Sequence, residues 1–331
     1  MRTGTLLLTA LLCAVSSVVS AQTFTIKVSS PTVNDVTHEW MKEFKTGVEA
    51  RAGGKVKVEI YPANQLGQIP ATVEGAAMGT IEVVAPASGF LIGLEPRFQV
   101  FDAPGLFNSM AAAQKVFADA EMRKRLSEYG GPKGLEPIAI WAHGPVMLLS
   151  HKAIRKVADF KGQKIRVPGA APLQIEPFRK LGAAPLSMPL GEVLSAMQNR
   201  TIDGLVASAT VFTAFKYFDL AKGLTALPGS FLVVPAMANK AFLKSLGPDL
   251  EKVVREEAFN AQRKVEAFAI QDADNTTKTW LKNGGELIAF DADETKKYLD
   301  QVTSALPAVL AANAKLKGDY EALAAASKAA N

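Results

Sequence analysis

The chain has 331 residues, of which 48% are hydrophobic and 21% are charged. This composition excludes a disordered, collagen-like or low-complexity chain, and the length predicts one large domain or two medium ones of roughly 150 residues each. Lys and Arg number 37 against 32 Asp and Glu, so the formal net charge is +5. Because this excess is spread thinly along the chain, we expect no nucleic-acid partner.

The first 21 residues are predicted to be a cleaved export signal. An apolar run over residues 6–19 is too short to span a bilayer comfortably, and small residues precede Gln22 at the expected cleavage site. An uncleaved membrane anchor is the alternative. Cleavage removes Cys13, the only cysteine, and leaves a chain without disulfides. An exported protein of this kind is typical of the bacterial periplasm.

Strands and helices are predicted to alternate along the rest of the chain. Apolar alternation and short apolar runs predict strands, and a long apolar run covers 137–150; the predicted strands are 24–28, 56–60, 81–85, 164–167, 201–207, 231–238 and 286–290. Helical periodicity, capping residues and Gly or Pro breaks predict the helices 35–52, 71–78, 111–128, 172–181, 190–199 and 249–283, with a helical tail from 293. This order predicts an α/β sheet covered by helices.

The sequence contains no motif of a familiar active site, metal centre or cofactor site. The histidines, His38, His143 and His151, lack zinc-binding spacing, and neither a Gly-x-Ser-x-Gly sequence nor a phosphate-binding loop is present. We therefore predict no catalytic residue, no metal and no cofactor. A Ser/His/Asp triad assembled from distant segments stays open, because triads are recognised by geometry and not by spacing.

Arg166 stands near the end of the strand predicted over 164–167. Ile165 and Val167 face one side of that strand, so Arg166 faces the other, and Pro168 halts strand pairing just beyond it. Ligands of α/β proteins bind at the carboxyl ends of strands, where an arginine can hold a carboxylate with two parallel hydrogen bonds. The residues alone leave open whether Arg166 binds a ligand or lies at a surface strand edge.

Several segments, taken in order, closely resemble the solute-binding proteins of tripartite ATP-independent periplasmic (TRAP) transporters of the C4-dicarboxylate type. They include Phe-Asp-Ala-Pro-Gly-Leu-Phe at 101–107 and Lys-Gly-Gln-Lys-Ile-Arg-Val-Pro at 161–168. The remaining segments that carry the resemblance are 54–62, 65–67, 181–185, 192–193, 196–198 and 202–204. Each segment is weak evidence by itself, whereas their shared order and spacing are specific.

The resemblance implies an α/β fold of the two-lobed periplasmic binding protein type, with mixed β-sheets flanked by helices. The implied division is a signal peptide at 1–21, lobe I at 22–145 completed by about 231–265, lobe II at 146–230 completed by about 284–331, and a helix at 249–283 that spans both lobes. Such a protein closes on an organic acid and delivers it to the membrane subunits of a TRAP permease. We expect a monomer, with a dimer as the alternative.

Arg166 corresponds to the signature arginine that holds the ligand carboxylate in this family. The loops 29–34, 66–68, 86–89 and 207–212 would line the cleft, which adds Ser30, Gln68, Ser88, Ala207 and Ser208 as candidate ligand contacts.

The chain departs from the family pattern at two positions. Sialic-acid and sugar-acid binders often carry Gly-aromatic-Arg where this chain has Gly144, Pro145 and Val146, and an asparagine stands where this chain has Ala207. Because a polar ligand group facing either side chain would be buried unpaired, we expect a monocarboxylate or a 2-oxo or 2-hydroxy acid with an apolar or aromatic body. Aromatic candidates to pack against that body are Phe90, Trp141, Phe212 and Phe231.

Alternative functions differ in what they need. A C4-dicarboxylate or sugar-acid binder of the same family would need more polar partners in the cleft. A receptor of an ATP-dependent importer would share the lobes but not the segments above. An exported enzyme would need a nucleophile with its base or a metal, and an adhesion protein would need repeats, none of which the sequence displays.

Overall fold

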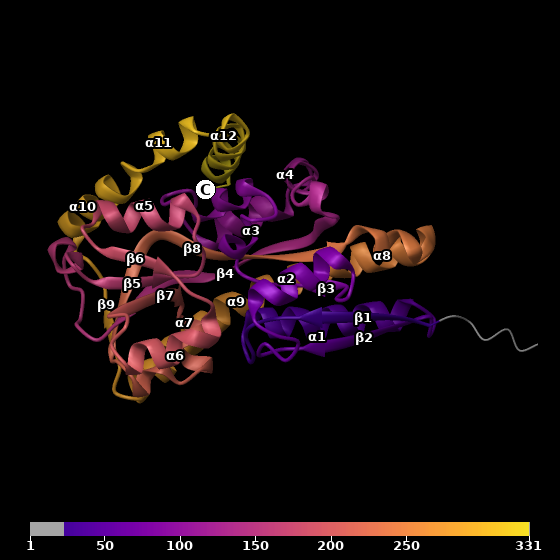
Figure 1. Ribbon diagram of the computed structural model, residues 1–331, viewed down its shortest axis with the longest axis horizontal. Helices are drawn as coiled ribbons and strands as arrows, with labels where there is room; N and C mark the ends of the chain where they lie inside the picture. The colour runs from indigo at the N-terminus through magenta and orange to yellow at the C-terminus, as the bar shows by residue number, and fades with distance from the viewer. Residues whose placement is uncertain (1–22, 331) are drawn as a thin grey trace, which may run out of the picture.

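The fold is built on one mixed β-sheet flanked by helices, seen in a computed structural model that describes residues 23–330 (Figure 1). The strands are β1 Phe24–Ser29, β2 Val56–Tyr61, β3 Val83–Val84, β4 Leu135–Ser150, β5 Lys164–Val167, β6 Ala184–Ser187, β7 Gly204–Ser208, β8 Gly223–Asn239 and β9 Glu286–Ile288. Their order in the nine-stranded sheet is β2-β1-β3-β8-β4-β7-β5-β6, with β9 paired to β8. The predicted export signal lies outside the described residues.

Two long antiparallel strands, β4 and β8, run through the whole sheet. They have 16 and 17 residues and pair along almost their entire length. At one end β8 pairs with β3, and at the other end β4 pairs with β7. We call the part built on β1, β2 and β3 lobe I, and the part built on β5, β6 and β7 lobe II. The strand predicted at 231–238 was therefore too short, because it belongs to a strand that crosses both lobes.

Helices cover both lobes. They are α1 Val36–Arg51, α2 Ile69–Met78, α3 Met110–Ala118, α4 Ala120–Leu126, α5 Pro172–Lys180, α6 Leu190–Gln198, α7 Ala209–Ala214, α8 Lys240–Ser245, α9 Gly247–Lys282, α10 Ala292–Thr303, α11 Leu306–Ala311 and α12 Ala314–Ala329. The predicted lobe-spanning helix is confirmed as α9, whose 36 residues join two hydrophobic clusters. Val254 and Val265 pack in the lobe I cluster around α1, and Trp280 packs in a lobe II cluster with α6 and α7.

Several sequence predictions were wrong in detail. The helix predicted over 111–128 is two helices, because Asp119 is extended and its side chain caps α4 by accepting a hydrogen bond from the Met122 amide. The strand predicted over 81–85 is limited to Val83 and Val84. Strand β6 and helices α7 and α8 were not predicted, because each is short and β6 carries Pro185 at a half-buried position.

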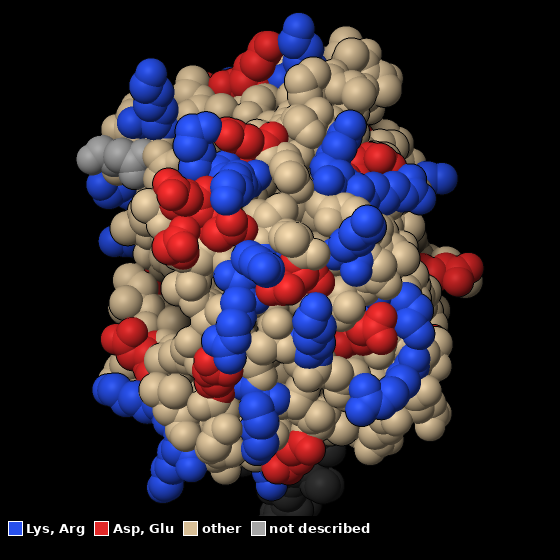
Figure 2. All heavy atoms as spheres, turned by 90° about the vertical axis from the view of Figure 1, so that its left-hand side faces the viewer, with Lys and Arg blue, Asp and Glu red and all other residues tan. Residues whose placement is uncertain are grey.

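No helix within residues 23–330 has both the length and the apolar character to cross a membrane. Figure 2 shows the side of lobe II near α10 and β9, where positive and negative side chains are interspersed. Ion pairs of these elements include Lys297–Glu294 on α10 and Arg155–Glu286, whose glutamate begins β9.

Candidate functional site

Arg166 lies on β5, close to the carboxyl end of the strand and facing the cleft between the lobes. Its neighbours in the parallel register are Leu186 on β6 and Leu205 on β7. The side chain is held by two carbonyl oxygens: Nε donates to Met188 at 2.9 Å and Nη1 donates to Val206 at 3.4 Å. The guanidinium carbon lies 6.0 Å from the centre of the Phe90 ring, which comes from lobe I.

The charge of Arg166 is buried without a protein counter-ion. The residue is 2% exposed, and among residues 23–330 no carboxylate lies within ion-pairing distance of its guanidinium. Burial lowers the pKa of Arg166 to about 10, so the group stays charged at neutral pH. A buried cation is costly unless it is paired, so the site favours an external anion.

A cavity in front of Arg166 is lined by residues of both lobes, and we call it the arginine cavity. Lobe I contributes Thr32, Ala87 and Phe90, and lobe II contributes Leu190 and Val211. His143, from the crossing strand β4, also lines it. The empty space amounts to about 440 Å³, including the open mouth. Apart from Arg166, the walls are mainly apolar.

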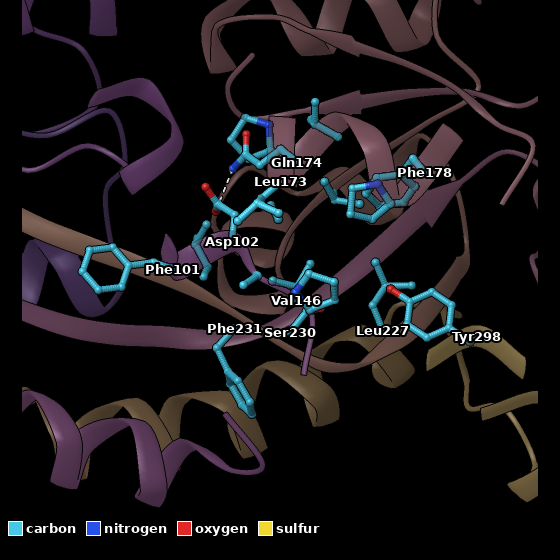
Figure 3. Close-up of a pocket in the computed structure, with 18 residues that line it drawn as sticks. Phe101, Asp102, Val146, Leu173, Gln174, Phe178, Leu227, Ser230, Phe231 and Tyr298 are labelled. Carbon is cyan, nitrogen blue, oxygen red and sulfur yellow. Dashed lines mark hydrogen bonds between the residues drawn. The ribbon is translucent and has the colours of Figure 1, made fainter. Parts of the chain in front are cut away.

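A second cavity lies beside the arginine cavity and shares Pro168, Ala207 and Leu232 with it as lining residues. It encloses about 600 Å³ of empty space, again including its mouth. Figure 3 shows its walls, which come from the end of η2 (Pro96–Asp102) and the residues just after it in lobe I, from α5 and from the crossing strands. Most of the wall is apolar, with Phe178 and Val146 as examples.

At the second cavity, the carboxyl group of Asp102 joins the two lobes through a hydrogen bond. Its Oδ1 accepts a hydrogen bond from Nε2 of Gln174 on α5 at 2.9 Å and a long one from Ser88 at 3.5 Å. Its other oxygen, Oδ2, is buried and has no hydrogen-bond partner among the described residues. Burial raises the pKa of Asp102 to about 7, and the hydrogen bonds from Gln174 and Ser88 offset this only in part.

Close backbone approaches show that the two lobes are in contact. A β-carbon added to Gly169 of lobe II would lie 2.1 Å from the carbonyl oxygen of Gly89 in lobe I. One added to Gly191 would lie 2.5 Å from Nε2 of Gln68. At Gly169 the neighbour is backbone, so only glycine fits there without movement, whereas at Gly191 the neighbour is the flexible end of the Gln68 side chain.

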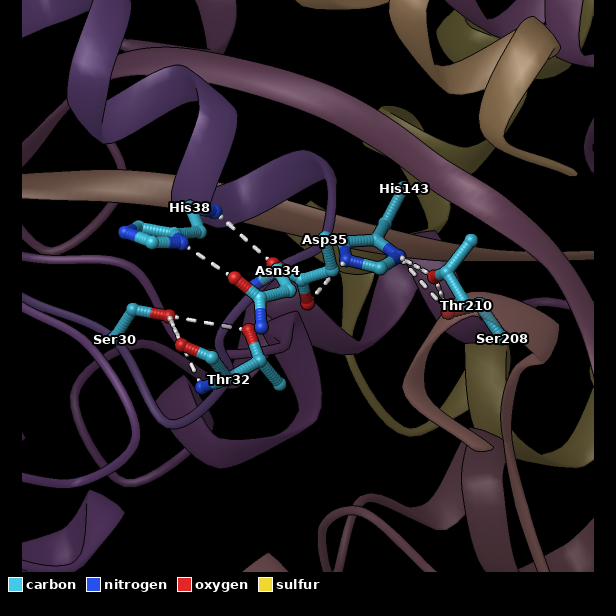
Figure 4. Close-up of polar contacts among 8 residues, drawn as sticks. All are labelled: Ser30, Thr32, Asn34, Asp35, His38, His143, Ser208 and Thr210. Carbon is cyan, nitrogen blue, oxygen red and sulfur yellow. Dashed lines mark hydrogen bonds and ion pairs between the residues drawn. The ribbon is translucent and has the colours of Figure 1, made fainter. Parts of the chain in front are cut away.

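A buried chain of polar groups links the lobes behind the arginine cavity (Figure 4). Nε2 of His143 lies 3.0 Å from Oδ2 of Asp35, and Nδ1 lies 2.8 Å from Oγ of Ser208. Thr210 extends the chain, 3.0 Å from Ser208. Burial raises the pKa of Asp35, but the charge and hydrogen bond of His143, with those from Thr32 and the His38 amide, outweigh it and hold the pKa below its usual value.

The order Asp35–His143–Ser208 is the order of groups in a hydrolytic triad, and it was not visible in the sequence because its members lie in three distant segments. Triad chemistry needs a serine that a substrate can reach. Ser208 is 0% exposed and lines neither of the two cavities. The hydrogen bonds from Asp35 through His143 to Ser208 therefore link α1, β4 and β7 in this conformation.

The structure places the sequence-predicted site residues in three groups. Arg166, Phe90 and Ala207 line the arginine cavity, and Ala207 also lines the second cavity together with Val146 and Phe231. The other predicted residues lie in cleft-edge contacts or in the core: Ser30 bonds Thr32, Gln68 meets Gly191, Ser88 meets Asp102, Ser208 meets His143, Phe212 packs near Trp280, and Trp141 stacks on Trp40.

Sequence reasoning did not select Asp102 and Gln174 as site residues. Asp102 lies in the 101–107 segment that carried the family resemblance, but a lone carboxylate near a proline gives no signal of burial. Its role depends on Gln174, which is 72 residues away in the sequence.

Asp102→Asn is expected to change the pH dependence of stability. The native state holds a proton on Asp102 up to about pH 7, whereas the unfolded chain releases it near the ordinary pKa of about 4, so wild-type stability falls as pH rises between these values. The variant lacks this loss. Its free energy of unfolding relative to wild type should rise by at most about 4 kcal/mol between about pH 4 and about pH 8.

Urea unfolding at the two pH values measures this difference, with the exposed Asp293→Asn as the matched control. Equal stability differences for Asp102→Asn at both pH values would show that Asp102 titrates normally.

His143→Leu is expected to destabilise the protein by roughly 2–4 kcal/mol at neutral pH, because it leaves the buried Asp35 carboxylate without its main partner. Adding Asp35→Asn, which retains the helix cap, should recover part of that loss. Urea unfolding of the two single variants and the double variant measures the coupling between the side chains. Additive effects would mean that the two residues do not depend on each other.

Comparison with known proteins agrees with this geometry. Residues 28–312 match the family model described as bacterial extracellular solute-binding protein, family 7. The 2,3-diketo-L-gulonate-binding periplasmic protein of Escherichia coli is 31% identical over 237 residues, which cover 70% of this chain and 72% of that protein. The C4-dicarboxylate-binding periplasmic protein of Rhodobacter capsulatus is 29% identical over 255 residues, 75% of this chain and 76% of that protein.

The fold is also that of solved TRAP proteins. A TRAP periplasmic solute-binding protein from Desulfovibrio salexigens, solved with bound orotic acid, has a TM-score of 0.87 and 25% identity, and the match covers 93% of this chain and all 100% of that one. The buried arginine between two lobes, the family match over most of the chain and this structural likeness lead to one conclusion. The chain belongs to family 7 of the bacterial extracellular solute-binding proteins, the solute-binding proteins of TRAP transporters.

Proposed function

We propose that this protein captures a small organic acid by its carboxylate at Arg166 and delivers it to the membrane subunits of a TRAP permease. The observation that carries the proposal is the buried charge of Arg166, which faces a cavity between the lobes and has no anionic partner among the described residues. A ligand carboxylate supplies the missing charge and two hydrogen-bond acceptors in the geometry that a guanidinium prefers.

The proposed setting is the periplasm, reached by export and cleavage of residues 1–21, with the protein acting as a binder and not as an enzyme. The proposed division assigns 22–145 and about 231–265 to lobe I, and 146–230 and about 284–331 to lobe II. The register shift in the β4–β8 pair between Pro145 and Met147 supports a boundary near residue 146.

For the ligand, we propose a monocarboxylate or a 2-oxo or 2-hydroxy acid with an apolar or aromatic body. Beside Arg166 the arginine cavity is walled by Phe90, Leu190, Val211 and the methyl group of Ala207, which offer no hydrogen bonds to a sugar hydroxyl. A second carboxylate or several hydroxyls would be buried there at a cost of about 1–3 kcal/mol each. A C4-dicarboxylate or sugar acid is the alternative, supported by the ligands for which the Escherichia coli and Rhodobacter capsulatus relatives are named.

A thermal-shift screen of residues 22–331 tests the ligand class, with aromatic and aliphatic monocarboxylates, 2-oxo acids, C4 dicarboxylates, sugar acids and neutral sugars as probes. The protein is unfolded and refolded beforehand to remove co-purified ligand. We expect a shift of a few degrees confined to acids with apolar bodies. A best response to C4 dicarboxylates or sugar acids would contradict the proposed class and keep the family. Turnover of a bound probe would favour an exported enzyme instead.

Arg166→Ala should weaken binding of the best acid by roughly 30-fold to several thousand-fold, because it removes one partner of a buried charged pair. Arg166→Lys should retain part of the affinity, since it keeps the charge but loses the two parallel hydrogen bonds. Isothermal titration calorimetry measures both variants. Unchanged affinity in Arg166→Ala would overturn the proposed role.

Gly169→Ala should weaken binding at least about ten-fold while the unfolding midpoint without ligand changes little. The added β-carbon would lie 2.1 Å from the Gly89 carbonyl oxygen, so it blocks closure and therefore the ligand-bound state. Gly318→Ala is the matched control, because a β-carbon there meets nothing within 4 Å. Equal affinities in the two variants would show that closure does not depend on this contact.

A further inference from the structure

The second cavity holds one polar atom whose hydrogen bonding is incomplete. Three of its polar side chains are engaged: Gln174 accepts from the Gly169 amide at 2.6 Å and donates to Asp102, and Ser230 hydrogen-bonds Tyr298. The exception is Oδ2 of Asp102, which is buried and has no partner among residues 23–330. A buried polar atom without a partner costs about 1–3 kcal/mol relative to a satisfied one, so this position favours a ligand group that can complete it.

The cavity is also close to Arg166. Pro168 directly follows the strand that carries Arg166, and Ala207 directly follows Val206, whose carbonyl oxygen accepts from the guanidinium. Pro168, Ala207 and Leu232 line both cavities, so the two cavities are adjacent. At Ala207 the side chain shared by the two cavities is only a methyl group.

We propose that the ligand spans both cavities: Arg166 holds its carboxylate, its apolar body passes Ala207, and a hydroxyl group at its far end hydrogen-bonds Oδ2 of Asp102. This inference rests on the proposed function and narrows the ligand to an apolar acid with a distal hydroxyl. The apolar part of the second cavity, with Val146, Val167 and Phe178, encloses the body of that ligand.

The surroundings of Asp102 favour a hydroxyl over an ammonium group at that end. The neighbours of Asp102 are Ser88 on η1 (Ser88–Leu91) and Gln174 on α5, both uncharged, and Tyr298 of α10 is the other titratable side chain that lines the cavity. Burial without a cation favours the neutral carboxyl. A neutral carboxyl can both donate to and accept from a hydroxyl, whereas an ammonium group would have to be buried without a counter-charge.

Matched pairs of acids that differ by one hydroxyl test the proposal. The probes are 4-hydroxyphenylacetate with phenylacetate, 3-(4-hydroxyphenyl)propionate with 3-phenylpropionate, and 6-hydroxyhexanoate with hexanoate, titrated calorimetrically into residues 22–331. In at least one pair we expect the hydroxylated acid to bind roughly 10- to 100-fold more tightly than its parent. Parents that bind as tightly as their hydroxylated partners in every pair would overturn the proposal.

Asp102→Leu should abolish that preference, so that both members of a pair bind with the same affinity. Because the substitution also removes the acceptor of the Gln174 hydrogen bond, the parent acid should bind somewhat more weakly than it binds to the wild type. Asp293→Leu, at an exposed position of α10, is the matched control and should keep the preference. If Asp102 only joined the lobes through Gln174, Asp102→Leu would weaken both members of a pair equally, and that result would overturn the proposal.

Ala207→Leu tests the path between the cavities. It should weaken the hydroxylated acid of the preferred pair by about ten-fold or more and affect acetate or pyruvate, which fit in the arginine cavity alone, much less. An unchanged hydroxyl preference in Ala207→Leu would overturn the spanning pose. The two proposals fail differently: loss of the Asp102 effect leaves Arg166-dependent binding intact, whereas acids that bind equally well to Arg166→Ala would remove the basis of both.

Discussion

A guanidinium buried at the end of a parallel strand, without a protein anion, is the constraint on which the site depends. Strand β5 ends at Val167, and two backbone carbonyls fix the Arg166 side chain without neutralising it. Carbonyl dipoles hold the geometry of the guanidinium but supply no countercharge. The protein therefore keeps a charge in an apolar cavity that only an external anion can balance, and this imbalance is what distinguishes a binding site from a structural ion pair.

The unpaired charge of Arg166 faces a cavity to which each of the two lobes supplies one side. Strands β4 and β8 continue through both lobes, and α9 packs on a cluster in each of them. Gly89 lies against Gly169 where the lobes meet, and a β-carbon at Gly169 would be in the way. An anion that contacts both lobes binds the closed form better than the open form, which is the thermodynamic condition for a ligand to shift the population toward closure.

Polar groups inside the cleft region are arranged in two different ways. The chain from Asp35 through His143 to Ser208 is complete, since each member has a partner, and it fixes how α1, β4 and β7 meet. Its groups are those of a hydrolytic triad, but its serine is buried and lines neither cavity. Asp102, in contrast, has one oxygen engaged across the lobes and one left over.

The sequence by itself determined the class of fold and the position of Arg166. Alternating apolar residues, a cap at Asn34 or Asp35 and the absence of Gly and Pro between 249 and 283 are local signals, and they predicted β1, α1 and α9 close to their observed bounds. The segments around 101–107 and 161–168 indicated the family. Short elements such as β6 and α7 were missed because their periodicity is too brief to separate from a loop.

Tertiary structure alone decided which side chains share a cavity. Phe212 and Trp141 are aromatic residues of the kind that stack on ligands, but they lie in the core. Val146 and Ala207, in contrast, both line the second cavity. The partners of Asp102 and His143 lie 72, 65 and 108 residues away along the chain. Burial and hydrogen-bond completeness depend on such distant contacts, so a sequence pattern specifies which groups are present, and only packing specifies which of them remain unpaired and available to a ligand.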